Sequence, residues 1–324
     1  MLLDNFLSAP ILFFALGLGA RLIGSPLYIP RAPATLLSQV LLIAIGIKGG
    51  LSMASHGLPA NVGWLLVCGL IFSLSTPWLG SWVLRYCSGL NNADAAAIAT
   101  HYGSVSVVTF MAALNYFHVR QVEYSGHMVA LLLVMEIPAL FTGIWLAGRS
   151  LGRPQPSSWW HWLHDVLANP SIVLLLGGLL IGLLARGDSA GMLEQAFIAP
   201  FYGLLCVFLL DMGLQAGDSQ PEWRVHGWVL PLFAIIFPLF CAVSAILCGF
   251  LLGLDASDAA LLAVLTASAS YIVVPAGLRM AIPNANVALG TTLALSVTFP
   301  FNIIVGIPLY FGFAQWVLGP GDFA

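Results

Sequence analysis

The amino-acid sequence predicts an all-α polytopic membrane protein, with ten transmembrane helices in two inverted five-helix repeats and with broken helices at the membrane midplane. Three observations lead to this prediction: an apolar composition, ten apolar stretches of spanning length, and an internal repeat. Hydrophobic residues make up 60% of the 324 residues, charged residues make up 7%, and the mean hydropathy is +0.98. A soluble domain carries about 25% charged residues, so much of this chain must face lipid.

Ten stretches are long enough to cross a hydrocarbon core of about 30 Å. In chain order they cover residues 10–25, 34–54, 62–86, 94–117, 125–148, 169–185, 196–216, 226–252, 258–281 and 287–317. The first stretch follows Asp4 and Asn5 without a basic segment or a small-residue cleavage site, so we expect no cleaved signal peptide.

The basic residues predict the orientation of these spans. With the N-terminus outside, only Arg120 and Arg186 lie at the outer face. The arginines then assigned to the inner face are Arg21, Arg31, Arg85, Arg149, Arg153, Arg224 and Arg279. This distribution satisfies the positive-inside rule. We therefore expect a multi-pass protein of the bacterial inner (plasma) membrane, surrounded by membrane lipid, with both termini extracytoplasmic.

The spans divide the chain into a first five-helix repeat (1–148), a cytoplasmic linker (149–168) and a second repeat (169–324). An odd number of spans per repeat makes the second copy inverted. The linker contains WWHWLHD at Trp159–Asp165, where His161 and His164 are three residues apart. They are either two metal ligands on one helix face or part of an interfacial helix with tryptophans at the headgroups. The absence of further ligands nearby favours the interfacial helix.

The internal repeat is clearest between Ala93–Leu114 and Ser257–Leu278. At an offset of 164 residues, eight of the 22 aligned positions are identical. The identical pairs are Asp94/Asp258, Ala95/Ala259, Ala96/Ala260, Ala99/Ala263, Ser104/Ser268, Ser106/Ser270, Ala112/Ala276 and Leu114/Leu278. Each aspartate precedes an Ala-rich run and is interpreted as a helix cap or a first-turn acid. A hydroxyl-rich repeat in so apolar a chain indicates a transporter with its substrate site at the repeat interface.

The repeated motifs GSVSVVT (Gly103–Thr109) and SASYIVVP (Ser268–Pro275) lie about 14–15 Å from the helix starts, half a hydrocarbon core. Glycine, serine, β-branched residues and proline continue a helix poorly, so both helices are predicted to break here. Two positive helix ends meeting at one depth make an anion site without an arginine. The alternative is a packing seam of small residues. The residues assigned to the anion site are Gly103, Ser104, Val105, Ser106, Val107, Thr109, Ser268, Ser270, Tyr271 and Ile272.

Three charged residues fall inside predicted spans, where charge is costly and usually functional. Lys48 and Asp211 lie one residue from equivalent repeat positions, and they could form either a structural or a coupling pair near the pseudo-two-fold axis. Glu136 precedes Pro138 and either binds a cation or proton or is satisfied by a neighbouring helix. His101 lies one turn before the first break, where packing or hydrogen bonding is favoured over a ligand role.

Four segments together resemble the sodium-dependent bicarbonate transporter family first recognised in cyanobacteria. In Ala263–Gln315, the stretches RMAIPNANVA and GIPLYFGFAQ and the proline in VTFPF follow the family. In Asp94–Leu114, the family's GAVSGST appears as GSVSVVT. MEIPALFTGI has Glu136 where the family has Asp, and IGIKGGL has Lys48 where the family has Thr. The resemblance covers nearly the whole membrane part.

The resemblance implies a ten-helix inverted-repeat carrier, a homotrimer, and an anion bound between two broken helices. It also implies a PII-like cytoplasmic regulator, although this linker is shorter than in the cyanobacterial members. The family motif SSSDISGPP reads SASYIVVPA here, so Tyr271 replaces an acid and Val273 a serine. Hard cations need oxygen ligands, so this change weakens the expectation of a sodium site, which would lie near Ser268, Ser270 and Glu136.

The function expected from these features is secondary active transport of a small anion, with sodium-dependent bicarbonate uptake by alternating access as the leading form. The alternatives are a proton-coupled or uncoupled carrier of another small anion, such as a monocarboxylate, and a channel or sensor derived from the fold. An enzyme is not expected, because the chain has no HExxH motif. No cofactor besides the sodium ion is implied, and no basic run suggests a nucleic-acid partner.

Overall fold

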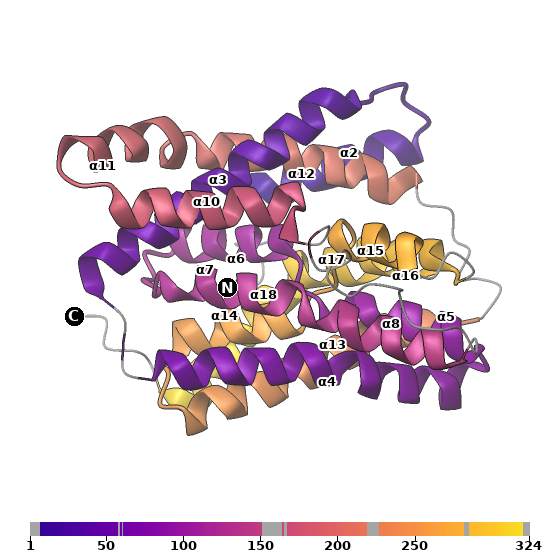
Figure 1. Ribbon diagram of the computed structural model, residues 1–324. Coiled ribbons are helices and arrows are strands. Elements are labelled where there is room, and N and C mark those ends of the chain that lie inside the picture. Colours follow the sequence, from indigo (N-terminus) through magenta and orange to yellow (C-terminus); the bar gives the residue numbers. More distant parts are fainter. Residues whose placement is uncertain are drawn as a thin grey trace.

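The computed structural model describes residues 7–57, 59, 61–150, 164, 167–218, 227–281 and 285–319, and every regular element in these ranges is a helix (Figure 1). Seven regions are long and apolar enough to cross a membrane: Arg31–Ser55, Val62–Ser88, Asn92–Val119, His127–Arg149, Asp188–Asp218, Val229–Leu251 and Val287–Leu318. The shorter apolar helices Ala9–Leu22 and Pro170–Leu184 lie at two of the remaining predicted stretches, and Ala256–Thr266 covers the first half of the third. The number of ten membrane crossings stays a prediction.

One group of helices, which we call the scaffold, lies along the upper side of Figure 1. It consists of α2 (Ala9–Leu22), α3 (Arg31–His56), α10 (Pro170–Leu184), α11 (Asp188–Leu193), η1 (Glu194–Ile198) and α12 (Phe201–Asp218). Helix α10 packs along α3, and α12 packs along α2. Each pair joins one helix from either half of the chain, so the scaffold is built from both predicted repeats.

Glycines set the close approach of α3 to α10. Gly46 and Gly50 on α3 face Gly178 and Gly182 on α10, and each of the four meets backbone of the opposite helix. A Cβ atom on Gly46 would lie 2.5 Å from the Leu175 carbonyl oxygen. This is the small-xxx-small spacing that allows two helix backbones to touch in a membrane.

The remaining helices form a second group, which we call the core. It contains α4 (Val62–Ser88), α5 (Asn92–Gly103), α6 (Val107–Val119), α7 (His127–Glu136), α8 (Pro138–Ser150), α13 (Val229–Leu251), α14 (Ala256–Thr266), α15 (Val273–Ala281) and the segmented run from α16 to α18. That run comprises α16 (Val287–Leu293), η3 (Ala294–Thr298), α17 (Phe299–Phe301), η4 (Asn302–Gly306) and α18 (Ile307–Leu318). Helix α5 packs on α4 and α8, and α14 packs on α13 and α18. Alanine-rich surfaces allow α5 and α14 to be buried along almost their whole length.

Asp94 and Asp258 are first-turn acids, one of the two roles expected for them. The backbone N–H of Asp94 donates to Asn91 Oδ1, and that of Asp258 donates to Asp255 Oδ1, both at 2.8 Å. Each carboxylate then reaches the start of another core helix. Asp94 Oδ1 accepts from the Asn286 N–H at 2.7 Å, and Asp258 Oδ1 accepts from the Ser125 N–H at 2.9 Å.

Two other predicted spans are interrupted at prolines. Helix α7 gives way to α8 at Ile137–Pro138, where Ser73 Oγ donates to the Met135 carbonyl and accepts from the Ala139 N–H. The hydroxyl thus bridges the two backbone groups that are left apart at the break. Around Pro300, the π-helical segments η3 and η4 interrupt the last span.

Most of the predicted linker lies outside the described residues, including His161 and Arg153; Arg224 lies outside them as well. His164 is described, in helical conformation. The metal-ligand and interfacial interpretations of WWHWLHD therefore both stay predictions.

Candidate functional site

The helices carrying GSVSVVT and SASYIVVP are both interrupted at these motifs. Helix α5 ends at Gly103, Ser104 and Ser106 are extended, and α6 starts at Val107. Helix α14 ends at Thr266, and α15 starts at Val273. Gly103 is required where it stands, because a Cβ atom there would lie 2.5 Å from Pro77 Cδ.

Hydrogen bonds join the two breaks directly. The Ser106 N–H donates to Ser268 Oγ at 2.8 Å, and the Ser270 N–H donates to the His101 carbonyl at 2.8 Å. His101 Nδ1 lies 2.6 Å from the Ser270 carbonyl oxygen, which can only accept, so this nitrogen carries the proton. His101 is therefore a hydrogen-bonding residue, as favoured from the sequence.

A further contact completes the second break. Asn302 Nδ2, in the π-helical segment η4, donates to the Ala267 carbonyl at 2.8 Å, and Tyr310 Oη donates to Asn302 Oδ1 at 2.7 Å. An interrupted helix leaves carbonyls without an intrahelical partner, and burial makes such groups costly. Asn302 of η4 supplies the missing partner, and Tyr310 of α18 positions the Asn302 amide.

A small cavity, which we call the central cavity, lies between the breaks. It encloses about 20 Å³, which is room for about one water molecule. Its lining residues are Ser38, Leu42, Val105, Ser106, Val107, Val108, Met111, Glu136, Ser171, Ser270, Tyr271, Ile272 and Val273. A larger anion would fit only after the walls move apart.

The structure divides the predicted anion-site residues into two classes. Val105, Ser106, Val107, Ser270, Tyr271 and Ile272 line the central cavity. Gly103, Ser104, Thr109 and Ser268 do not. The hydroxyls of Ser104 and Ser268 point instead to the carbonyls of Glu136 and Leu265, because extended and terminal backbone needs polar partners there.

The backbone N–H groups at the two breaks also differ in whether they are free to bind an anion. The N–H groups of Ser106 and Ser270 are occupied by the bonds between the breaks. Within the described residues, Val107 and Val108 at the start of α6 have no hydrogen-bond partner for their N–H groups. A positive helix end with free donors thus faces the cavity from α6.

Besides Glu136 of α7, three lining residues come from elements that the motifs do not include. Ser38 and Leu42 belong to α3, and Ser171 is in the first turn of α10, so the scaffold supplies one wall. In the sequence, Ser38 and Ser171 are recognisable only as serines inside or at the edge of apolar spans, and many other serines share this feature. Only the packing of scaffold on core selects these two.

The sequence model of the Na⁺-dependent bicarbonate transporter superfamily matches residues 9–315. The chain belongs to this superfamily. The match spans both broken helices and the scaffold. A comparison with curated proteins finds no match. Membership makes this chain a multi-pass membrane transporter and implies that it is not an enzyme.

Glu136 is the one carboxylate among the described residues that line the central cavity. It lines the central cavity and is 2% exposed, and its Oε2 has no hydrogen-bond partner within the described residues. A buried carboxylate is costly unless a cation or a proton neutralises it. No group of three or more His, Cys, Asp or Glu side chains that could hold a metal ion occurs in the described ranges.

Lys48 and Asp211 do not form the predicted pair. The Lys48 ammonium lies 5.1 Å from the centroid of the Tyr124 ring, whereas Asp211 Oδ2 accepts from Gln215 Nε2 at 2.8 Å. Neither residue lines the central cavity. Lys48 and Asp211 occupy nearly equivalent positions in the sequence repeat, but they line two separate large cavities and are not neighbours.

The vestibule that contains Asp211 encloses about 940 Å³ and also contains Arg21 and Arg31. We call it the Arg31 vestibule. It shares Ser38, Leu42, Ser171, Tyr271 and Ile272 with the central cavity. These shared residues are the partition between the two spaces. Tyr271 thus stands at the mouth of the cavity.

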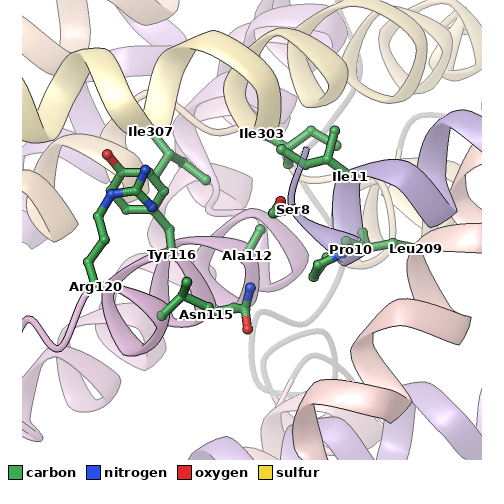
Figure 2. A pocket seen from close by; sticks show the side chains of 11 residues that line it. Ser8, Pro10, Ile11, Ala112, Asn115, Tyr116, Arg120, Leu209, Ile303 and Ile307 are labelled. Carbon is green, nitrogen blue, oxygen red and sulfur yellow. The ribbon is translucent and has the colours of Figure 1, made fainter. Parts of the chain in front are cut away.

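A separate pocket of about 230 Å³ lies between α2, α6, α12 and the part of the last span where η4 meets α18 (Figure 2). The Arg120 guanidinium lies over the Tyr116 ring, 3.7 Å from its centroid, and Asn115 is on the same helix. This pocket does not share a residue with the central cavity. It lies farther along α6 from the break.

Proposed function

We propose that this superfamily member is a secondary transporter that takes up bicarbonate together with sodium by alternating access. The observation that carries the proposal is the crossing of two broken helices at a cavity with free backbone donors and serine hydroxyls. Positive helix ends and hydroxyls bind anions without a fixed cationic side chain. Among the described lining residues, none is basic.

A bound anion would share the central cavity with the Glu136 carboxylate. Two negative charges inside one small cavity of low dielectric constant repel each other strongly, so a cation has to accompany the anion. Glu136 and Ser270 provide the oxygen ligands that a sodium ion prefers. This arrangement explains how anion binding would depend on sodium.

Alternating access follows from the division into scaffold and core. The cavity adjoins the Arg31 vestibule across a partition to which the core contributes Tyr271 and Ile272 and the scaffold contributes Ser38, Leu42 and Ser171. Sliding of the core along α3 would open the cavity to one side and then to the other. In inverted-repeat transporters such motion moves one helical bundle against the other around a fixed site.

The proposal includes the predicted architecture: two inverted repeats (1–148 and 169–324), a cytoplasmic linker, both termini outside, an inner-membrane location and a homotrimer. The symmetric pairing of α10 with α3 and of α12 with α2 supports two-fold related repeats. The caps support it as well, because Asn91 and Asp255 are 164 residues apart and cap Asp94 and Asp258 in the same way.

Uptake of labelled bicarbonate into proteoliposomes tests the proposal. We expect uptake that is accelerated by an inward sodium gradient and that is lost when choline replaces sodium. Equal uptake in both conditions would rule out sodium coupling. No uptake in either condition, from protein that is folded, would rule out bicarbonate as the substrate.

The second candidate is a proton-coupled or uncoupled carrier of another small anion, such as a monocarboxylate. The unpartnered Oε2 of Glu136 favours the proton-coupled form, because one proton would neutralise the carboxylate as well as a sodium ion would. The loss of the family's acid at Tyr271 also removes an oxygen ligand for sodium. A pH gradient in place of the sodium gradient distinguishes the two.

A further inference from the structure

Lys48 is the only lysine of the chain, and it lies in a pocket away from the central cavity. The pocket encloses about 180 Å³ between α3, α6 and the start of α12, and we call it the Lys48 pocket. Asn115 and His118 of α6 also line it, and no carboxylate does among the described residues.

The polar groups of the Lys48 pocket are donors suited to an oxyanion. Lys48 presents an ammonium, and its one described interaction is with the face of the Tyr124 ring. Asn115 is 7% exposed and makes no hydrogen bond to any described residue. The amide atoms of Asn115 are not among the fully buried polar atoms, so they are open to a ligand or to water. Ammonium and amide N–H groups together match the two oxygens of a carboxylate-like anion.

The Lys48 pocket and the central cavity lie on the same seam between α3 and α6. Leu42 and Met111 line the cavity, and Ile45 and Leu114 line the pocket. Three residues separate the members of each pair, which is about one helical turn along each helix. All four side chains are buried, so they form an apolar seal about two layers thick.

The Lys48 pocket is also connected to a large open space. A vestibule of about 1130 Å³ shares Lys48, Ile198 and Ala199 with it and contains Arg186. This vestibule is at the end of α3 opposite the Arg31 vestibule, since it takes in Leu51 and Ser55 where the other takes in Arg31 and Ala34. An anion from this side would meet Lys48 before it met the seal.

We propose that the Lys48 pocket is a second anion site, at which a small carboxylate-like oxyanion waits before the Leu42–Met111 and Ile45–Leu114 layers open to the central cavity. This inference rests on the proposed anion transport and adds an entry site to it. Lys48 Nζ and Asn115 Nδ2 are the donors. The site is specific to one side of the membrane, so it governs the KM for anion arriving from that side.

Chemical labelling tests occupancy of the pocket independently of transport. Because the chain has one lysine, a membrane-impermeant amine-acylating reagent reports on Lys48, with the N-terminal amine as an internal reference. We expect bicarbonate or acetate to slow labelling of Lys48 but not of the reference, and chloride at equal ionic strength to protect less. Asn115→Leu should weaken the protection. Labelling that no oxyanion slows, or a Lys48 that the reagent cannot reach, would overturn the proposal.

Transport by variants then places the site on the route. Lys48→Met should raise the KM about tenfold for anion that arrives through the vestibule next to Lys48, which we call external anion. A tenfold change corresponds to the loss of about one charge-assisted hydrogen bond. The kcat and the KM for anion from the opposite side should stay unchanged. Lys48→Arg should restore the external KM. Equal changes in KM on both sides would show that Lys48 acts on the central cavity, against the proposal.

The Ser270→Leu variant separates this proposal from the proposed function. With the central cavity filled, transport should cease while oxyanions still protect Lys48. Loss of protection in this variant would show that the two spaces are one site, and the entry site would be rejected. A wild-type protein that transports neither bicarbonate nor acetate would refute the proposed function, whereas protection of Lys48 would still support an oxyanion in its pocket.

Discussion

The backbone N–H of Ser106 donates to the hydroxyl of Ser268 at 2.8 Å, across 162 residues of sequence. Each residue belongs to the break of its own helix, so one hydrogen bond holds the two breaks in register. The same Ser268 hydroxyl donates to the Leu265 carbonyl at 2.8 Å, and it is buried. Its role is therefore to position the backbone around the cavity, which separates it from Ser270, two residues later.

Ser268→Ala should lower stability more than Ser270→Ala. The first change leaves the buried Ser106 N–H without a partner, at a cost of about 1–3 kcal/mol. The second removes a cavity-lining hydroxyl for which no hydrogen bond to a described residue is seen. Thermal unfolding in detergent measures the difference. Equal melting temperatures for the two variants would contradict the structural role of Ser268.

Ser270→Leu should abolish transport without loss of folded protein. The central cavity encloses only about 20 Å³, and a leucine side chain would fill the space that an anion needs. Labelled bicarbonate uptake and the yield of monodisperse protein are the measurements. Ser244→Leu, on the surface of α13, is the matched control and should transport normally. Normal uptake by Ser270→Leu would exclude the cavity as the substrate site.

Glu136→Gln should uncouple transport from its driving ion. The amide removes the negative charge that a sodium ion or a proton neutralises, so anion uptake should continue down its own gradient and lose its response to the ion gradient. Uptake under separate sodium and pH gradients identifies the coupled ion in the wild type. If Glu136→Gln still concentrates anion against its gradient, the carboxylate is structural.

Gly178→Ala should destabilise the scaffold, whereas its neighbour Gly177→Ala should not. A Cβ atom on Gly178 would lie 2.7 Å from the Ile43 carbonyl oxygen, so α3 and α10 would have to separate. A Cβ atom on Gly177 meets nothing within 4 Å. Overpacking of this kind typically costs about 1–3 kcal/mol. The melting temperatures of the two variants are the measurement, and a similar loss in both would show that the contact between Gly178 and α3 is not responsible.

Cys87 and residue 251 should be reached from opposite sides of the membrane. They are equivalent positions at the ends of α4 and α13, at the offset of 164 residues, and both are exposed. In variants with a single cysteine, at Cys87 or as Leu251→Cys, an impermeant thiol reagent should label the first only from the cytoplasmic side. Labelling of both from one side would mean that the repeats run parallel and would remove the inverted architecture.

The sequence alone determined the features that depend on composition and on local conformational preference. Apolar stretches of spanning length predict membrane helices whatever their neighbours are. Serine, glycine, β-branched residues and proline interrupt helices locally, so the breaks at Gly103–Thr109 and Ser268–Pro275 could be predicted from the chain. The first-turn positions of Asp94 and Asp258 follow in the same way, because a cap bonds to residues only three positions away.

Only the tertiary structure decided which polar groups face the cavity and which partners they have. Ser104 and Ser106 are two residues apart in one motif, yet the first bonds the Glu136 carbonyl and the second lines the cavity. Likewise, Lys48 lies over Tyr124 instead of pairing with Asp211. A buried polar group takes whichever partner the crossing helices bring within about 3 Å. Which partner is within reach depends on how segments distant in the chain pack together, so it cannot be predicted from the local sequence.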